Sequence, residues 1–545
     1  MSRGLLRLTA IAAATAALAA CATTASAQVP PVVNAPAGSV RGTTDDAISA
    51  FKGIPFAAPP VGDMRWRPPA PAATWQGVRD ATQFGAACMQ PTPVIQTIYS
   101  ADIGRTSEDC LTLNVWTPSI TGKAPVMVWI HGGALVTGSS KETLYDGARL
   151  AREGVVVVTI NYRLGVLGWL AHPDLSAESP VGISGNYGLM DQVAALEWVK
   201  RNIAAFGGDP DNVAIAGESA GGLSVLYLMS SPLAQGLFDR AIAQSAYMIS
   251  TPELKQARYG APAAEAAGSA LARTLQAPSL RVLRGMDAQA LTDRAAMSGF
   301  ATFGVVDGVV LPRQIVDVFD RGEQAKVPVL AGFNSGEIRS LRMLAPPVPA
   351  DAAAYERTIR ERYGDLADAF LRLYPSADME ESILAASRDA LYGWTSERMV
   401  RSQTQAGQPS FLYLFDHGYP ATDAARLHAF HASELPYMFG TLDRTPPRWP
   451  AIPDTPGERQ LSDALVRYWA SFVRSGRPVA DDAAAWSPYG EARSVLAIRE
   501  APSSETHLYP GMFELHEAAV QRRKVADQAW NWNAGLASPS LAEAQ

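Results

Sequence analysis

The stretch Asn212–Met229, NVAIAGESAGGLSVLYLM, decides the fold of this chain. Its first residues, Asn212–Ala216, form an apolar run typical of a buried strand, and Ala220–Met229 has the composition of a helix. Between them Gly217–Gly221 reads GESAG and matches the pattern G-x-S-x-G. In a strand–turn–helix context this pattern predicts a nucleophile elbow, a tight turn whose small residues leave the Ser219 hydroxyl clear of the sheet.

Strands and helices alternate on both sides of this turn. Ala124–Ile130 and Val155–Ile160 are apolar runs without polar alternation, which favours central strands covered on both faces. Apolar residues spaced three and four apart predict a helix over Asp191–Ala205. We expect further strands at Ala241–Gln244, Val327–Ala331, Ser410–Phe415 and Val495–Arg499. This order predicts an α/β fold with a mostly parallel central sheet flanked by helices.

Two long stretches interrupt the alternation. Residues 250–325 and 340–408 read as mainly helical insertions, and both are too long to be simple connections. We expect them to wall or cover a binding cleft. The sequence shows no internal repeat and no low-complexity linker, so we expect residues 28–545 to form a single domain.

Composition excludes several classes of protein. The 545 residues are 48% hydrophobic and 18% charged, which is typical of a globular chain and not of a disordered or fibrous one. Lys and Arg total 46 against 53 Asp and Glu, and no basic tract is present, which argues against a nucleic-acid partner. Beyond the N-terminus no apolar run approaches membrane-spanning length, so a polytopic membrane protein is excluded.

The N-terminus has the pattern of an export signal. Arg3 and Arg7 are followed by the apolar run Leu8–Ala20, and Ala25–Ala27 supplies a small-x-small cleavage site before Gln28. This order predicts a signal peptide over residues 1–27. The segment also contains LAAC, which resembles a bacterial lipobox and leaves lipidation as an alternative to cleavage after the ASA motif. Both alternatives predict an exported protein, either periplasmic or secreted.

Cysteine usage agrees with export. Lipidation would fall on Cys21, and both processing routes leave Cys88 and Cys110 as an even pair, which suits an oxidising compartment. A disulfide between them would contribute roughly 3 kcal/mol on the chain-entropy model. Two free buried thiols are the alternative.

A serine nucleophile needs a base and a carboxylate that orients the base. In elbow-type folds these partners follow in the order serine, acid, histidine. His431 lies in a loop after the predicted strand Ser410–Phe415, where the base is expected, and His428 is its closest rival. Position alone does not decide between the two histidines.

The acid is expected directly after the strand Val327–Ala331, and Glu337 lies there. Asp307 instead reads as a turn residue of a hairpin. Asp416 ends a later strand and is too close to that strand to reach a distant histidine. These positions favour Glu337.

An oxyanion formed during serine attack needs N–H donors. His131–Ala134, HGGA, follows a predicted strand as HGGG-type loops do, and the N–H of Ala220 would complete the hole. His131 itself is expected to be a structural residue of the turn. The sequence has no phosphate loop, dinucleotide fingerprint or metal-ligand cluster, so we expect no cofactor and no metal.

These residues carry a resemblance to the type-B carboxylesterase/lipase family, which includes bacterial para-nitrobenzyl esterases and cholinesterases. Phe206–Gly221 resembles the serine signature of the family, and Glu108–Trp116 resembles its second signature. Similar blocks occur at Asn161–Leu170, Gly185–Gln192 and Phe238–Ala246, and the resemblance runs from about Val40 to Trp532.

The resemblance implies an α/β-hydrolase fold with Ser219 as nucleophile, Glu337 as acid and His431 as base, because HASELPYMFG is similar to the base segment of the family. It implies that the N–H groups of Gly133, Ala134 and Ala220 are the oxyanion donors. It also implies a disulfide between Cys88 and Cys110 and a buried ion pair between Arg65 and Glu108.

The activity implied is hydrolysis of small carboxylic esters through an acyl-enzyme, and the N-terminal signal pattern predicts that the enzyme is exported. Many members have Gly at the position of Ala134, where we expect only altered crowding. The loop between Cys88 and Cys110 lacks the Trp that binds choline in cholinesterases, which argues against a choline ester specialist. A lipase or amidase with the same triad, or a non-catalytic binding scaffold, are the alternatives. The sequence leaves the natural ester and the oligomeric state open.

Overall fold

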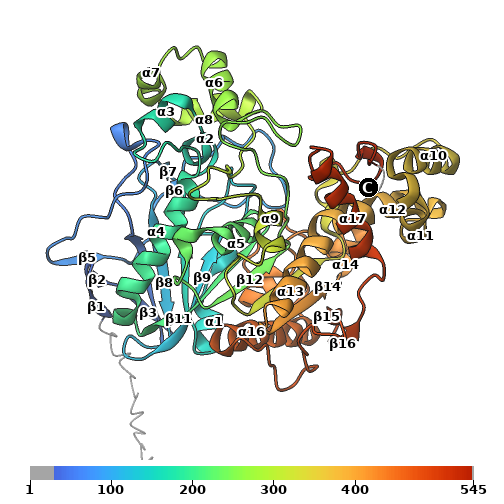
Figure 1. The fold of residues 1–545 in the computed structure, drawn as a ribbon. Helices are drawn as coiled ribbons and strands as arrows, with labels where there is room; N and C mark the ends of the chain where they lie inside the picture. Colours follow the sequence, from blue (N-terminus) through green and yellow to red (C-terminus); the bar gives the residue numbers. More distant parts are fainter. Residues whose placement is uncertain (1–29, 543–545) are drawn as a thin grey trace, which may run out of the picture.

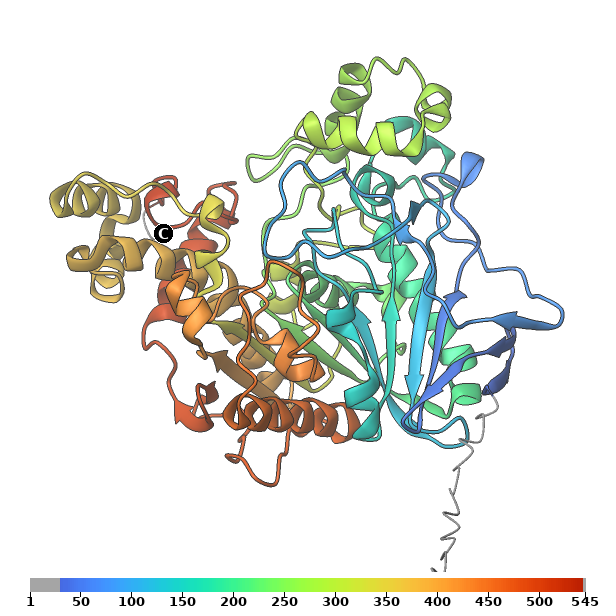
Figure 2. The ribbon, with the colours of Figure 1, turned by 180° about the vertical axis from the view of Figure 1, so that it is seen from behind.

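The computed structural model describes residues 30–542 (Figures 1 and 2). The predicted signal peptide over residues 1–27 and Cys21 lie outside this range. A large mixed sheet runs through the centre of the fold. Its strands, in spatial order, are β16 (Pro502–Thr506), β15 (Ser494–Ile498), β14 (Ser410–Phe415), β13 (Val329–Asn334), β12 (Arg240–Gln244), β11 (Gly208–Glu218), β9 (Ala124–Ile130), β10 (Val156–Ile160), β8 (Thr112–Thr117), β4 (Ile48–Pro55) and β3 (Thr43–Asp45).

The middle of this sheet is parallel, as predicted, from β10 across to β15. Both margins are antiparallel, through β16 on one side and β8, β4 and β3 on the other. Two smaller sheets lie toward the N-terminus. They consist of β1 (Val32–Ala35), β2 (Gly38–Arg41) and β5 (Val78–Asp80), and of β6 (Ala87–Cys88) with β7 (Thr106–Ser107).

The non-alternating apolar runs are explained by a sheet that is buried on both faces. In β9, Val126, Val128 and Ile130 pack into one hydrophobic core, while Met127 and Trp129 pack into a second core on the opposite face. Successive side chains of a strand point to opposite faces, so both sets are apolar only when both faces are covered.

Helices cover the two faces. One core contains side chains of α4 (Tyr187–Asn202) and α5 (Ala220–Ser230), and the other contains side chains of α1 (Ala148–Arg152), α15 (Leu435–Phe439) and α16 (Pro456–Ser475). Figure 1 shows α4 and α16 in different layers of the molecule. The helix predicted over Asp191–Ala205 begins earlier, at Tyr187, and its last residues form a 3₁₀ turn that stops at Gly207 in the left-handed region.

The two stretches predicted as insertions carry many of the remaining helices. The first contains α6 (Ala264–Thr274), α7 (Leu280–Gly285), α8 (Ala288–Met297) and α9 (Ile315–Asp320). The second contains α10 (Ala352–Tyr363), α11 (Ala367–Leu373), α12 (Met379–Arg388), a π-helical turn over Asp389–Gly393, and α13 (Trp394–Gln405). Figure 1 shows α6–α8 at one end of the molecule and α10–α12 in a lobe beside α17 (Met512–Val525). The short helices α2 (Gly165–Trp169), α3 (Pro173–Glu178) and α14 (Pro420–Ala424) lie outside both stretches. Among the described residues, no helix combines the length and apolar composition needed to cross a membrane.

Candidate active site

Ser219 occupies the predicted elbow between β11 and α5. Its backbone is in a strained conformation, with φ 57° and ψ −120°, which a non-glycine residue rarely adopts. The flanking glycines are required by space, because a Cβ on Gly221 would lie 2.0 Å from the carbonyl oxygen of Ile130 and one on Gly217 would lie 2.5 Å from the Gly221 backbone. The Ser219 N–H donates to the carbonyl of Gln244 at 3.0 Å. The turn therefore packs closely against the carboxyl ends of β9 and β12.

Glu337 and His431 meet at the same edge of the sheet. Glu337 lies in the turn after β13, and His431 lies in the loop after β14, so parallel neighbouring strands bring both segments together. The Nδ1 atom of His431 is hydrogen-bonded to Oε2 of Glu337. An ionised carboxylate only accepts, so Nδ1 carries the proton in this bond and Nε2 is left to accept one.

Further hydrogen bonds hold the Glu337 carboxylate in place. The side chain is fully buried, and its Oε1 accepts from the Ser245 hydroxyl at 2.6 Å and from the Asn334 N–H at 2.8 Å. The two loops are also joined directly, because the Gly336 N–H donates to the Ala429 carbonyl at 2.8 Å. These contacts fix the orientation of the carboxylate that faces His431.

Glu218, the variable residue of the GESAG motif, lies on the other side of the imidazole. Its Oε1 is 3.1 Å from Nε2 of His431, and both side chains are buried. Burial raises the pKa of Glu218 to about 8. Burial opposes protonation of His431, but the charges of Glu218 and Glu337 outweigh it and raise the pKa of His431 to about 9.

The rival residues form a separate pair. His428 Nε2 is 3.0 Å from Asp416 Oδ1, so Asp416 does reach a histidine, the rival one, in the loop that follows its own strand. Asp416 raises the pKa of His428 through this hydrogen bond. Asp307 lies in a turn, where its Oδ1 accepts from the N–H groups of Val309 and Val310 at 2.9 and 2.8 Å. The turn does not belong to the predicted hairpin, because Val306 forms only an isolated parallel bridge with Glu253 and no strand in the described range flanks the turn.

The HGGA loop packs directly on Ser219. A Cβ on Gly132 would lie 2.9 Å from the carbonyl oxygen of Glu218 and 3.2 Å from Cβ of Ser219. Gly133 and Ala134 both have positive φ, 100° and 56°. Their N–H groups, and that of Ala220 at the first turn of α5, donate no hydrogen bond to a residue in the described range. These N–H groups therefore make no hydrogen bond within the described part of the chain, which is one condition for an oxyanion hole.

His131 has the structural role that was predicted for it. It is buried, its ring stacks on Tyr162 at 4.6 Å, and its Nδ1 lies 2.9 Å from the carbonyl oxygen of Gly132. Burial lowers the pKa of His131 to about 4. The ring is therefore neutral at physiological pH and packs in the turn.

Two tyrosines next to His431 were not identified from the sequence. Tyr392, in the π-helical turn, lies 5.4 Å from the His431 ring between centroids, and Tyr99 lies edge-on at 6.4 Å. They come from segments far from His431 in the chain, and no motif marks either one. Only their placement in the fold reveals them.

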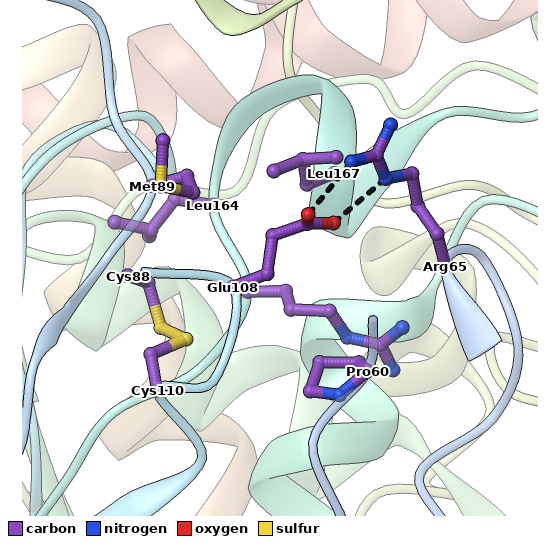
Figure 3. A pocket seen from close by; sticks show the side chains of 9 residues that line it. Pro60, Arg65, Cys88, Met89, Glu108, Cys110, Leu164 and Leu167 are labelled. Atoms are coloured by element: carbon purple, nitrogen blue, oxygen red, sulfur yellow. Dashed lines mark hydrogen bonds and ion pairs between the residues drawn. A yellow bond between two sulfur atoms is a disulfide. The ribbon is translucent and has the colours of Figure 1, made fainter. Parts of the chain in front are cut away.

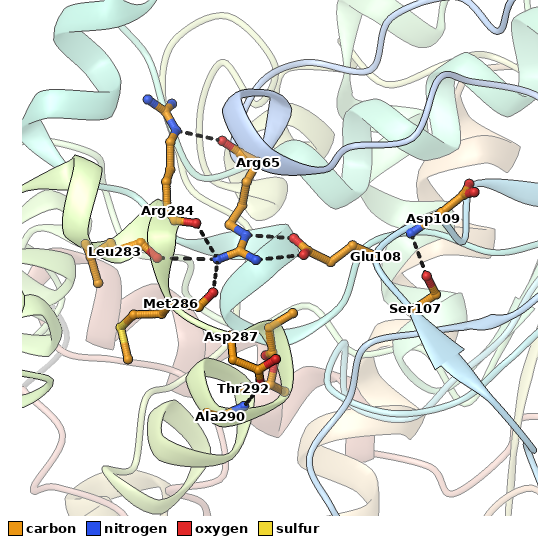
Figure 4. Close-up of polar contacts among 11 residues, drawn as sticks. Arg65, Ser107, Glu108, Asp109, Leu283, Arg284, Met286, Asp287, Ala290 and Thr292 are labelled. Carbon is orange, nitrogen blue, oxygen red and sulfur yellow. Dashed lines mark hydrogen bonds and ion pairs between the residues drawn. The ribbon is translucent and has the colours of Figure 1, made fainter.

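The predicted disulfide and ion pair are both present. Cys88 is bonded to Cys110. Arg65 and Glu108 form a two-pronged ion pair, with Nε–Oε1 and Nη2–Oε2 distances of 2.7 Å each (Figure 4). Residues 30–542 contain no group of three or more His, Cys, Asp and Glu side chains that could hold a metal ion.

Comparisons with known proteins agree on one family. The sequence profile of the Carboxylesterase family matches residues 29–515. The chain is 38% identical to a fumonisin B1 esterase of Sphingopyxis macrogoltabida, over 85% of each chain, and 35% identical to a para-nitrobenzyl esterase of Bacillus subtilis, over 89% of this chain and 99% of that one. A solved PNB esterase structure matches with a TM-score of 0.76 and 32% identity, over 89% of this chain and 99% of that one. The chain belongs to the carboxylesterase family: it is a carboxylic ester hydrolase with an α/β-hydrolase fold.

Proposed function

We propose that this protein is an exported serine carboxylesterase that hydrolyses small-molecule esters through the triad Ser219, Glu337 and His431. The observation that carries the proposal is the buried His431–Glu337 hydrogen bond at the sheet edge where the strained Ser219 turn lies. A base needs one ring nitrogen anchored and the other turned toward the serine, and this bond anchors Nδ1. Nε2 faces Glu218 at 3.1 Å, and the proposed reaction requires the same nitrogen to accept the proton of Ser219.

In the proposed reaction His431 takes the proton of Ser219 on Nε2 while the serine oxygen attacks the ester carbonyl. The imidazolium formed is stabilised by Glu337, and it then protonates the leaving alcohol. Water, activated by the same nitrogen, attacks the acyl-enzyme and releases the acid. The residues act in the same roles in both halves of the reaction.

The oxyanion of each tetrahedral intermediate is assigned to the free N–H groups of Gly133, Ala134 and Ala220. Removal of one such donor typically costs about 3–4 kcal/mol of transition-state stabilisation. The methyl group of Ala134 leaves its N–H available, so we expect this departure from the common Gly to alter crowding and not donor number.

Hydrolysis of para-nitrophenyl acetate, butyrate and palmitate tests the activity. We expect turnover that favours the short acyl chains and disappears in Ser219→Ala, while Ser119→Ala, which changes an exposed serine, retains wild-type rates. Fast palmitate turnover would instead indicate a lipase. Wild-type protein that is folded and inactive on all three esters would contradict the proposal and favour a binding scaffold.

Export is the second part of the proposal, and the signal pattern of residues 1–27 and the Cys88–Cys110 disulfide support it. We expect the mature chain to be found outside the cytoplasm. An intact mass that begins at Gln28 would assign the ASA cleavage site, and a lipid-modified N-terminus that is lost in Cys21→Ser would assign the lipobox. An unprocessed cytoplasmic chain would contradict export.

A further inference from the structure

The loop closed by the disulfide reaches the catalytic centre through Tyr99. The Tyr99 hydroxyl oxygen lies 2.6 Å from the hydroxyl oxygen of Ser340 and 3.0 Å from the carbonyl oxygen of His431. Ser340 follows directly on the turn Glu337–Arg339, which carries the proposed acid. One side chain therefore joins the acid segment and the base segment from a third part of the chain.

The direction of these two hydrogen bonds follows from the available protons. The His431 carbonyl can only accept, and the Tyr99 hydroxyl has a single hydrogen, so Tyr99 donates to the carbonyl. The Ser340 hydroxyl must then donate to the oxygen of Tyr99. The result is a chain of two hydrogen bonds, from Ser340 to Tyr99 and from Tyr99 to the backbone carbonyl of His431, the proposed base.

The Tyr99 ring is also fixed by packing. It lies edge-on to Trp449 at 6.0 Å and tilted against Phe430 at 6.4 Å, measured between ring centroids. Phe430 immediately precedes His431, so the ring and the hydroxyl of Tyr99 contact the same short segment. Aromatic contacts of this kind hold an orientation as well as burying apolar area.

The rest of the loop is anchored at several other points. The Cys88–Cys110 disulfide lies beside a small cavity next to Glu108 and Leu164 (Figure 3). Next to the disulfide, Gln90 donates to the Gly138 carbonyl and accepts from the Gly138 N–H, both at 3.1 Å, which ties the loop to the segment after the HGGA turn.

The ion pair next to Cys110 anchors the loop to the first helical insertion. Arg65, which holds Glu108, also donates to the carbonyls of Arg284 and Met286 at 3.0 and 2.8 Å (Figure 4). The base of the loop is therefore fixed in the fold, and Tyr99 extends from it to His431.

We propose that Tyr99 is a positioning residue for the catalytic base, which holds the backbone of His431 and the Glu337 turn in register and depends on the disulfide-closed loop for its own place. This inference rests on the proposed function, because it assumes that His431 is the base. Gly336 and Asn334 also join the two segments, so Tyr99 adds to the alignment without being its only source.

Tyr99→Phe tests the proposal because it removes the hydroxyl and keeps the ring. We expect kcat to fall by about tenfold, the equivalent of one hydrogen bond, with KM within about twofold of wild type, because the bond orients the base and does not contact substrate. Ser340→Ala leaves the bond to His431 in place, so its kcat is expected to fall by less than about threefold.

Tyr355→Phe is the matched control. The Tyr355 hydroxyl also donates to a backbone carbonyl at 3.0 Å, that of Tyr374, in the lobe formed by α10 and α11. We expect this variant to lose a similar amount of thermal stability and to keep wild-type kcat. Equal kcat in Tyr99→Phe and Tyr355→Phe would overturn the proposal. Activity that persists in Ser219→Ala would instead overturn the proposed function.

The dependence on the loop is tested by combining Tyr99→Phe with Cys88→Ser/Cys110→Ser. We expect the cysteine change to lower kcat in the wild-type background and to have little further effect when Tyr99 is already Phe, because the connection is then already broken. Equal fold-losses in both backgrounds would refute the coupling. If the cysteine variant does not fold, the comparison of Tyr99→Phe with Tyr355→Phe still decides the positioning role.

Discussion

Neutralising Glu218 is expected to move the pH dependence of ester hydrolysis toward lower pH. Its Oε1 lies 3.1 Å from Nε2 of His431, the nitrogen that accepts the serine proton in the proposed reaction. A general base has to be neutral, so activity rises as pH increases through the pKa of His431. The Glu218 charge favours the imidazolium and raises that pKa, so Glu218→Gln lowers it and the variant reaches full activity at lower pH.

The distance sets the size of the effect. Two unit charges 3.1 Å apart interact by about 5 kcal/mol at an effective dielectric constant of about 20, which corresponds to about four pKa units. Burial raises the pKa of Glu218 to about 8, below the pKa of about 9 for His431, so the carboxylate is largely ionised where His431 titrates. The amide oxygen of Gln at this position can still accept a hydrogen bond from Nε2, so the realised shift is smaller. We expect the midpoint of the acid limb to fall by about one to three pH units.

The assay is kcat/KM for a para-nitrophenyl ester across the pH range, corrected for spontaneous hydrolysis, in wild type and Glu218→Gln. Asp416→Asn is the matched control, because it removes a carboxylate 3.0 Å from the rival His428. An unchanged midpoint in Glu218→Gln would refute the electrostatic argument. A midpoint that moves in Asp416→Asn and not in Glu218→Gln would assign the base to His428.

Three further predictions concern the surroundings of the nucleophile and the loop. Gly132→Ala places a Cβ 2.9 Å from the Glu218 carbonyl and should lower kcat by at least about tenfold by displacing the oxyanion donors, whereas Gly285→Ala, with open space at its Cβ, should leave initial rates unchanged. Ser245→Ala removes a 2.6 Å hydrogen bond to Glu337 and should lower the free energy of unfolding by about 1–3 kcal/mol, measured by denaturant titration, together with kcat; wild-type values of both would contradict this role. Loss of the Cys88–Cys110 disulfide should lower the free energy of unfolding by roughly 3 kcal/mol, and a calorimetric Tm that does not respond to its loss would show that the loop carries no such constraint.

The central strands could be predicted because short apolar runs rich in β-branched and aromatic residues are typical of strands buried on both faces. Ala124–Ile130 and Ser410–Phe415 coincide with β9 and β14, since a short apolar run without alternation must be buried on both faces. The strand predicted at Val327–Ala331 begins instead at Val329 and continues to Asn334. Pro328 lacks the N–H that a central strand donates, and this explains the later start.

The marginal strands of the central sheet and the strands of the smaller sheet were harder to predict. The strand β8 overlaps the block Glu108–Trp116, which was recognised only by resemblance. The strands β1, β2 and β5 consist of three or four residues each, too short for a periodicity to be visible. β1 and β2 pair as a local hairpin, but the pairing of β5 with β2 and of β8 with β4 and β10 joins segments distant in the chain, which local sequence does not encode.

The candidate site also contains some residues that the sequence predicts and others that only the structure reveals. The elbow at Ser219 and the HGGA loop could be found from the sequence because tight turns demand small residues at fixed spacing. The choice of His431 over His428 came from the resemblance, because spacing alone left them equal. Tyr99 and the second contact of His431, with Glu218, follow only from the packing of distant segments.

The most direct test of the account is to find which residue becomes covalently modified during turnover. A reactive phosphonate ester that mimics the tetrahedral intermediate should label wild-type protein once, and peptide mass spectrometry should place the label on Ser219. Labelling should be lost in Ser219→Ala and slowed strongly in His431→Gln, while His428→Gln reacts like wild type. A label on another residue, or labelling that does not depend on His431, would contradict the account.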